Sequence, residues 1–203
     1  SWSNTRPFKV AVATDEVRDR ISTEFLSRWN VLSKIMRKGI FNKLRIIFSR
    51  YGLPTSNRRI AKPYPAELKP RAERLGREMY ESFGVQRGDR DGRDQQWATN
   101  YRFFGAPVEL FIFIHKGLNI YAASDAGLMM QNLILSAQAH GLGTCAQGAV
   151  AVWEDVVRKE FEVPKEYRLL CGISMGYPSD SSINDFRANR LGVEELTLKP
   201  RKV

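Results

Sequence analysis

Cysteine and histidine are scarce in this chain of 203 residues, which has two of each. Cys145 and Cys171 lie far apart in apolar stretches, which indicates reduced, buried thiols, excludes a disulfide framework and favours a cytoplasmic setting. His115 and His140 have no cysteine or carboxylate at ligand spacing, so we expect no metal site. His140, which precedes Gly141, is interpreted as a polar cap at a helix end.

Long apolar runs are also missing. No segment reaches the roughly 18 consecutive apolar residues that a membrane helix requires. Residues 1–4 lack the basic and apolar regions of a signal peptide. With 43% hydrophobic residues and 27% charged residues of mixed sign, the chain can bury one core of ordinary size. We therefore expect a soluble protein in which residues 1–203 form a single domain and which does not bind membranes.

Acidic residues are absent between residues 28 and 65, where the number of cations equals the net charge of +10. These cations are Arg28, Lys34, Arg37, Lys38, Lys43, Arg45, Arg50, Arg58, Arg59 and Lys62. Residues 31–65, called the basic segment below, begin with the pattern of a basic amphipathic helix that ends near Gly52. A solvated helix face is one interpretation, and a surface for nucleic acid or anionic membranes is another. Because Phe41, Phe48 and Tyr51 lie among aliphatic residues, we favour core packing and expect no nucleic-acid partner.

The remaining patterns indicate an α+β domain. Strands are expected at residues 8–13, 108–114, 143–150 and 168–175, and helices at 16–30, 66–83, 90–104, 120–140 and 153–161. Residues 108–114 are apolar except for Glu109, as in a strand with both sheet faces covered, so we expect this strand at the centre of the sheet. Residues 194–203 include strand-like Leu196 and Leu198 but little with which to pair.

Two of the expected helices carry burial patterns. Residues 120–140 are apolar around almost the whole helix circumference, which is typical of a buried helix. In a domain of this size, we infer that a second subunit covers part of that surface. Helix 66–83 places Leu68, Leu75, Met79 and Phe83 at the spacing of a single buried face.

Motifs for side-chain catalysis are not found. Residues 141–146 match the dinucleotide fingerprint G-x-G-x-x-A, but they follow a helix and lead into a strand, which reverses the required order. Gly141 is better explained as a left-handed helix end. There is also no nucleophile elbow and no phosphate-binding P-loop. The chain is therefore typical of a protein whose bound cofactor performs the chemistry.

Five segments, in order along nearly the whole chain, resemble the FMN-dependent nitroreductase superfamily. Residues 1–8 (SWSNTRPF) are similar to the family segment P-S-x-x-N-x-Q-P-W, which also runs into a strand. The other four are residues 105–108 before the apolar strand, residues 125–133 with 139–144, residues 172–178, and residues 189–195. They resemble the family's central strand, its dimer-core helix and turn, its closing strand and its C-terminal arginine motif.

This resemblance implies a nitroreductase-like α+β fold with a central, mostly antiparallel sheet flanked by helices. It also implies an intertwined homodimer with two FMN molecules at the interface, in which the C-terminal tail adds a strand to the partner's sheet. The family's Arg-Ser-rich opening segment, which holds the phosphate and the ribityl chain, has no counterpart in this sequence.

Position by position, the resemblance implies that FMN is bound by Ser1, Trp2, Ser3, Asn4, Arg6, Asn100, Gln147, Gly148 and Arg190. The first four line the flavin, largely from the partner subunit, and Asn100 lies near the isoalloxazine ring. Gln147 and Gly148 bring a backbone N–H near flavin N5, which accepts hydride, and Arg190 binds the phosphate. Arg6 stands where most of the family has glutamine. It either stabilises the reduced flavin at its N1/O2 edge, or it faces solvent or pairs with phosphate.

The implied activity is electron transfer from NADPH or NADH to a nitroaromatic or quinone-like acceptor, by a ping-pong scheme in which donor and acceptor use the same shallow cavity. No side chain is expected to act as a catalytic residue. Reductive dehalogenation, flavin fragmentation and azoline oxidation are alternatives on the same fold. For the basic segment, the resemblance adds the interpretation of a lid over the flavin that attracts the phosphates of NADPH or an anionic substrate.

Overall fold

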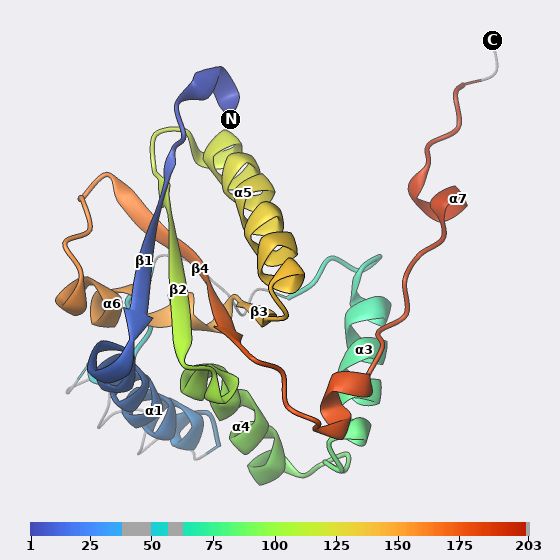
Figure 1. The fold of residues 1–203 in the computed structure, drawn as a ribbon. Coiled ribbons are helices and arrows are strands. Elements are labelled where there is room, and N and C mark those ends of the chain that lie inside the picture. The colour runs from blue at the N-terminus through green and yellow to red at the C-terminus, as the bar shows by residue number, and fades with distance from the viewer. Residues whose placement is uncertain (38–49, 57–62, 202–203) are drawn as a thin grey trace. The chain divides into compact units, whose positions relative to one another are not determined.

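The computed structural model describes residues 1–37, 50–56 and 63–201 (Figure 1). In chain order its elements are η1 (Trp2–Asn4), β1 (Phe8–Thr14), α1 (Asp15–Arg37), α3 (Lys69–Ser82), α4 (Arg90–Ala98), η2 (Thr99–Gly105), β2 (Val108–His115), α5 (Asn119–Ala139), β3 (Gly143–Gln147), η3 (Ala149–Trp153), α6 (Glu154–Glu160), β4 (Tyr167–Gly176), η4 (Ser182–Asp185) and α7 (Val193–Leu196). They form two compact units, Ser1–Lys62 with Asp94–Pro178 and Pro63–Arg93 with Ser179–Val203.

The first unit contains a four-stranded sheet in the order β1-β2-β4-β3, and all neighbouring strands are antiparallel. The register pairs Val12 with Leu110 between β1 and β2, and Gln147 with Gly172 between β3 and β4. The prediction of a central, apolar strand is confirmed, because β2 has neighbours on both sides and its residues 109–114 are buried. The predicted antiparallel α+β architecture is also confirmed.

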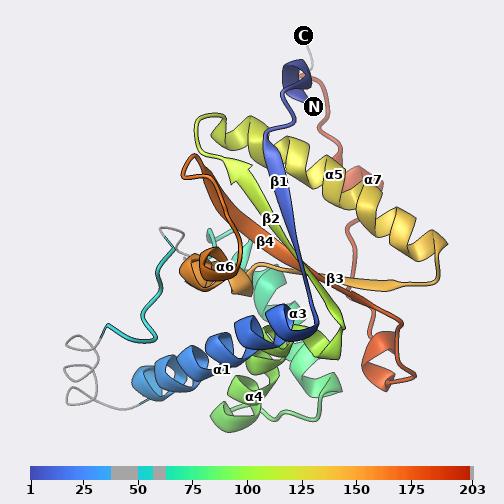
Figure 2. The ribbon, with the colours of Figure 1, turned by 60° about the vertical axis from the view of Figure 1, so that its left-hand side comes forward.

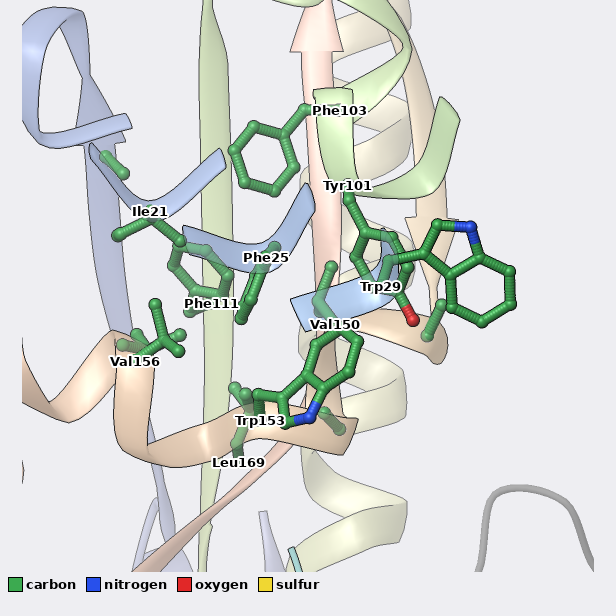
Figure 3. Close-up of a cluster of buried hydrophobic side chains, with 14 of the residues drawn as sticks. Ile21, Phe25, Trp29, Tyr101, Phe103, Phe111, Val150, Trp153, Val156 and Leu169 are labelled. Atoms are coloured by element: carbon green, nitrogen blue, oxygen red, sulfur yellow. The ribbon is translucent and has the colours of Figure 1, made fainter. Parts of the chain in front are cut away.

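An aromatic core covers one face of the sheet. It joins Phe111 of β2 to α1, η2, η3 and α6 (Figure 3). Ile21, Phe25 and Trp29 recur every four residues along α1 and therefore lie on one helix face, toward this core. The rings of Tyr101 and Trp153 have centroids 5.1 Å apart, within the range of favourable aromatic pairs.

Helix α5 covers the other face (Figure 2). The alternate β2 residues Leu110, Ile112 and Ile114 pack against it around Ala122 and Ala126. The outer side of α5 is open: Ile120, Leu128 and Leu135 are 72%, 64% and 57% exposed. The sheet therefore buries one side of this helix, and the expected covering of its other side by a second subunit stays a prediction.

Helix α1 is longer than predicted. It begins at Asp15, as the acidic first turn suggests, but continues past residue 30 to Arg37. No glycine or proline interrupts residues 15–37, so the helix has no local reason to stop at the boundary predicted from the change in composition. Most of the predicted basic helix beyond Arg37, residues 38–49, lies outside the described residues.

Other predicted boundaries need correction. The expected helix 90–104 ends at Ala98 and continues as η2, in which Phe103 and Phe104 adopt left-handed φ values of 55° and 52°. The expected strand 143–150 ends at Gln147, since residues 149–153 turn into η3. Strand-like Leu196 instead ends the short helix α7.

The second unit is built around α3. The prediction of a buried face on this helix is wrong for the described part of the chain, because no α3 side chain is buried and Leu68 and Leu75 are exposed. Tyr80 makes a T-shaped ring contact with Phe83, and the guanidinium of Arg93 lies 5.6 Å from the centroid of the Tyr80 ring. These contacts hold the helix end within its own unit.

The end of α5 confirms the predicted cap. Gly141 has φ 74°, and the N–H of Leu142 donates to the carbonyl of Ala137, as in a left-handed helix termination. The ring Nδ1 of His140 lies 2.8 Å from the carbonyl oxygen of Ser136. The glycine-rich turn therefore terminates a helix, in agreement with the rejection of a dinucleotide fingerprint.

Candidate functional site

Two residues of the predicted site meet on the aromatic side of the sheet. Gln147 ends β3, is 2% exposed, and donates from Nε2 to the backbone carbonyl of Asn100 at 3.1 Å. Asn100 lies in η2, and its Nδ2 donates to the carbonyl of Trp97 at 3.0 Å. These residues are 47 positions apart in sequence, so the packing of η2 against β3 creates the arrangement.

Gly148 follows immediately and is the N-cap residue of η3. A Cβ atom added here would meet no atom of the described residues within 4 Å, so the backbone is open on that side. A glycine next to a buried, anchored side chain lets a flat ligand approach the main chain closely. The predicted neighbourhood of Gln147 and Gly148 therefore combines a fixed backbone with free space.

The N-terminal segment forms a polar turn next to α5. The backbone N–H of Arg6 donates to Oγ of Ser1 at 3.1 Å, and that of Asn4 donates to the carbonyl of Ser1 at 3.1 Å. Ser3, Asn4 and Arg6 have φ values of 48°, 56° and 45°, conformations that side-chain-bearing residues rarely adopt. Ser1, Ser3, Asn4 and Arg6 are exposed, while η1, which includes Trp2, contacts α5. In the described chain these polar groups point outward.

Arg18 braces the strained end of η2. Its Nε donates to the carbonyl of Ala106 at 2.8 Å and its Nη2 to that of Arg102 at 3.2 Å. The guanidinium also lies 5.6 Å from the ring centroid of Phe103, within the range of a cation–π contact. These three contacts hold residues 102–106 where the chain enters β2.

Glu109 is a buried carboxyl that sequence reasoning did not assign to the site. Its side chain is fully buried, and its Oε2 accepts a hydrogen bond from Oγ of Ser174 at 2.7 Å. Burial raises the pKa of Glu109 to about 8, against the opposing effects of the Ser174 hydrogen bond and the charge of Arg18. The signal was present in the sequence as the one charged residue in an apolar strand.

Arg190 lies in the second compact unit, in an irregular stretch before α7. It is exposed, and its Nη1 donates to the carbonyl of Ala188 at 3.0 Å. The structure therefore groups Asn100 with Gln147 and Gly148, and Ser1 with Arg6. Arg190 belongs to a different part of the chain.

The described cysteines and histidines show the arrangement neither of a disulfide nor of a metal site. In the part of the chain that the structure describes, neither cysteine forms a disulfide, and no three His, Cys, Asp or Glu residues gather as metal ligands. Cys171 lies 3.6 Å from Sδ of Met130. Cys145 lies on the edge strand β3 and is exposed, so the prediction of a buried thiol is wrong there; partial burial of the sulfur and the nearby Glu109 still raise its pKa. His115 accepts the N–H of Gly117.

Over residues 1–37, 50–56 and 63–201, none of the helices has both the length and the apolar character needed to cross a membrane.

Comparisons with known proteins agree with the fold. Chloronitrobenzene nitroreductase of Comamonas testosteroni is 28% identical over 198 residues, which are 97% of this chain and 80% of that protein. Nitroreductase NfnB of Mycolicibacterium smegmatis is 29% identical over 203 residues, covering 97% of this chain and 76% of that protein. A crystal structure of the FMN-dependent nitroreductase NfnB from Mycobacterium smegmatis, in complex with NADPH, matches with a TM-score of 0.76 at 28% identity, covering 98% of this chain and 81% of that one.

The sequence profile of the Nitroreductase family matches residues 1–177. This match covers most of the chain, including both the sheet and the cluster around Gln147. The chain therefore belongs to the Nitroreductase family.

Proposed function

We propose that the protein is an FMN-dependent oxidoreductase that transfers electrons from NADPH or NADH to nitroaromatic or quinone-like acceptors. The named activities of its relatives support this substrate class, and the FMN-dependent structural neighbour in complex with NADPH supports the cofactor and the donor. The observation that carries the proposal is the pairing of Gln147 with Asn100 beside the open backbone of Gly148.

The residues at this site fit a flat, polar cofactor. Gly148 has no side chain and leaves room at its Cα, while its neighbour Gln147 is fixed by burial and by its hydrogen bond to η2. FMN, when bound, supplies the hydride-accepting ring. The protein's part is then to hold residues 147–148 in place, so that a backbone N–H faces the ring and donor and acceptor stack at one position.

We also assign the FMN phosphate to Arg190, as the resemblance implies. The guanidinium is exposed and has one hydrogen bond to a nearby carbonyl, which leaves donors for a bidentate phosphate contact. Replacing Arg190 with glutamine is expected to weaken binding of FMN but not of riboflavin, which lacks the phosphate. Equal weakening of both ligands would exclude this role.

Ser1, Trp2, Ser3 and Asn4 are proposed to line the flavin of the partner subunit, and Arg6 to contact the ring. The outward direction of the described polar groups and their unusual φ values are consistent with a second chain completing the site. An Arg6→Gln variant is expected to lower the flavin reduction potential, because a positive charge stabilises the reduced, anionic ring. An unchanged potential would leave Arg6 as a solvent or phosphate contact.

We propose a homodimer in which the outer side of α5 is covered by the partner. Three large apolar residues are more than half exposed there, and exposed apolar patches of this kind mark interaction surfaces. In the tail, Leu198 is 94% exposed, which agrees with a segment that pairs with another chain. A cytoplasmic location, where thiols such as Cys145 stay reduced, is part of the same proposal.

The basic segment is proposed as a lid that attracts NADPH. Its residues 38–49 and 57–62 lie outside the described residues, while the N–H groups of Thr55 and Ser56 both donate to the carbonyl of Val152. Charge reversal at Arg58 and Arg59 is expected to raise the KM for NADPH with little change in kcat. An unchanged KM would remove this role.

Visible spectroscopy tests the central proposal. The purified protein with FMN should show flavin absorption that bleaches on anaerobic addition of NADPH and returns on addition of a nitroaromatic compound. Bleaching without reoxidation by nitroaromatics or quinones would contradict the acceptor class. A protein that neither binds FMN nor oxidises NADPH would contradict the whole assignment.

A further inference from the structure

Glu109 occupies space that belongs to the missing side chain of Gly172. A Cβ atom added to Gly172 would lie 2.1 Å from Oε1 of Glu109 and 2.9 Å from Cγ2 of Val150. Gly172 lies between β2 and β3 in the sheet, paired with Phe111 on one side and with Gln147 on the other. The carboxyl of Glu109 therefore fills the cross-strand position next to Gln147.

Both side chains present a buried oxygen with no hydrogen-bond partner among the described residues: Oε1 of Glu109 and Oε1 of Gln147. Glu109 of β2 and Gln147 of β3 are separated by β4, but the Glu109 carboxyl reaches the side-chain position of Gly172, which is the cross-strand partner of Gln147. Such partners lie about 5 Å apart at Cβ, so the carboxyl is within reach of the glutamine side chain. Each of these two buried acceptors, if left without a donor, costs the free energy of an unsatisfied buried polar group. One proton on the carboxyl converts one acceptor into a donor and removes both costs.

The groups packed around Glu109 favour its neutral form. Its carboxyl accepts a hydrogen bond from the hydroxyl of Ser174 on β4, the titratable thiol of Cys145 on β3 is close enough for its pKa to be raised by the Glu109 charge, and Arg18 of α1 is a nearby cation. The guanidinium of Arg18 donates to the carbonyls of Ala106 and Arg102. The effect of burial on the pKa of Glu109 outweighs the attraction of this cation. The pKa is therefore about 8, and the carboxyl is mostly protonated below this pH.

We propose that Glu109 is a positioning residue: as a neutral carboxylic acid it donates a hydrogen bond to Oε1 of Gln147 and so holds residues 147–148 for the flavin. Gln147 is then held from two sides, by this bond and by its own donation to the carbonyl of Asn100. Ionisation of Glu109 breaks the first bond and places a negative charge beside the amide oxygen. This inference rests on the proposed flavin function for its consequence, but the protonation of Glu109 can be tested without flavin.

The first test measures the free energy of unfolding of the flavin-free protein in urea between pH 5.5 and 8. An acid with a folded pKa near 8 and an unfolded pKa near 4.5 keeps its proton in the folded state only, so stability falls as pH rises through this window. Relative to Glu109→Gln, the unfolding equilibrium of the natural chain should shift toward unfolding by about tenfold per pH unit. The window ends below the raised pKa of Cys145.

Glu166→Gln, the same substitution at an exposed position, serves as the control and should keep the slope of the natural chain. Ser174→Ala removes the hydrogen bond that lowers the pKa of Glu109, so its slope should extend to higher pH. Equal slopes in the natural chain and Glu109→Gln would overturn the neutral acid.

The second test follows FMN affinity by fluorescence from pH 6 to pH 9.5. The natural chain should weaken by about fivefold around pH 8, the factor expected for one lost hydrogen bond. Glu109→Gln, which keeps a donor, should bind tightly throughout, and Glu109→Leu should bind weakly at every pH. If Glu109→Leu does not fold, the upward shift of the midpoint in Ser174→Ala takes its place.

The outcomes separate the two proposals. A stability slope without FMN binding in any variant would overturn the flavin function and leave Glu109 as a buried acid only. FMN binding with the same pH profile in the natural chain and Glu109→Gln would overturn the positioning role and leave the flavin function intact.

Discussion

The two faces of the sheet are completed in different ways. On one face, α1, η2, η3 and α6 enclose an aromatic core in which Phe25, Phe111 and Trp153 are almost inaccessible to solvent. On the other face, a single helix covers the strands and leaves its own outer side apolar and open. The aromatic core is therefore enclosed within one chain, whereas α5 is covered by the sheet on one side and exposes apolar residues on the other.

This difference supports the places proposed above for the site and for the interface. The aromatic face ends at the cluster of Asn100, Gln147 and Glu109, where buried polar groups need a rigid surrounding to stay in place. On the α5 face the described buried residues are mostly apolar, with Asp125 of α5 as a buried carboxyl, and the outer side of the helix presents apolar surface. A rigid, closed layer suits the positioning of a cofactor, and an open apolar layer suits association with a second copy.

The largest effect is expected from Phe25→Ala in the closed core. Removal of a fully buried ring that contacts Tyr101, Phe103, Phe111 and Trp153 should lower the free energy of unfolding by about 3–5 kcal/mol. Urea denaturation monitored by circular dichroism measures this change. A loss under about 1 kcal/mol would show that the closed face is not the stabilising one.

A smaller loss is expected from Arg28→Ala, which removes a buried polar link between α1 and α6. Arg28 is buried and pairs with Glu24 and Asp155, both at 2.8 Å. We expect a loss of about 2 kcal/mol, below the value for a fully buried pair because both carboxylates are partly exposed. Arg20→Ala, which removes a solvent-screened ion pair with Glu160, is the control and should change stability much less.

Leu128→Ala on α5 sharpens the contrast between the faces. Because this side chain is mostly exposed in one chain, truncation should change the stability of the isolated subunit by no more than about 0.5 kcal/mol. The dimer should weaken by about tenfold or more, since the proposed interface buries the leucine only on association. Analytical ultracentrifugation measures the dissociation constant, with Asn30→Ala on exposed α1 surface as the control. Unchanged dimerisation would place the interface elsewhere.

The smallest effect concerns acid stability. Burial raises the pKa of Asp155, but hydrogen bonds from Arg28 and Thr55 lower it more, so the net shift is downward. A depressed folded pKa contributes stability above the unfolded pKa, and this contribution is lost as pH falls below about 4. The natural chain should therefore lose stability between pH 4 and pH 2 slightly more steeply than Asp155→Asn. Parallel curves would show that the pair is fully screened by solvent.

Local patterns were sufficient for most of the secondary structure. The apolar run of β2, the four-residue spacing of Ile21, Phe25 and Trp29, and the left-handed Gly141 all depend on neighbours in sequence. The helix and strand boundaries that were predicted wrongly depend on contacts between residues far apart in sequence. η2 departs from the helix before it because Phe103 turns into the core under the brace of Arg18, 85 residues earlier in the chain.

The candidate site also combines residues that the sequence could predict with residues that only the tertiary structure brings together. Gln147 and Gly148 could be proposed from a family resemblance, since a motif is contiguous in sequence. Glu109 could be noticed as a charge in an apolar strand, but its partners Ser174 and Gly172 reach it only through strand register.

Periodicity and composition were enough to predict the α+β class, the central strand and the apolar helix, because hydrophobic burial is read from residues a few positions apart. The tertiary structure decided which side of that helix is covered, which carboxyl is buried, and which residues surround Gln147. These outcomes depend on the pairing of strands far apart in sequence, and the free energy of a buried polar group is set by those pairings and not by its own residue type.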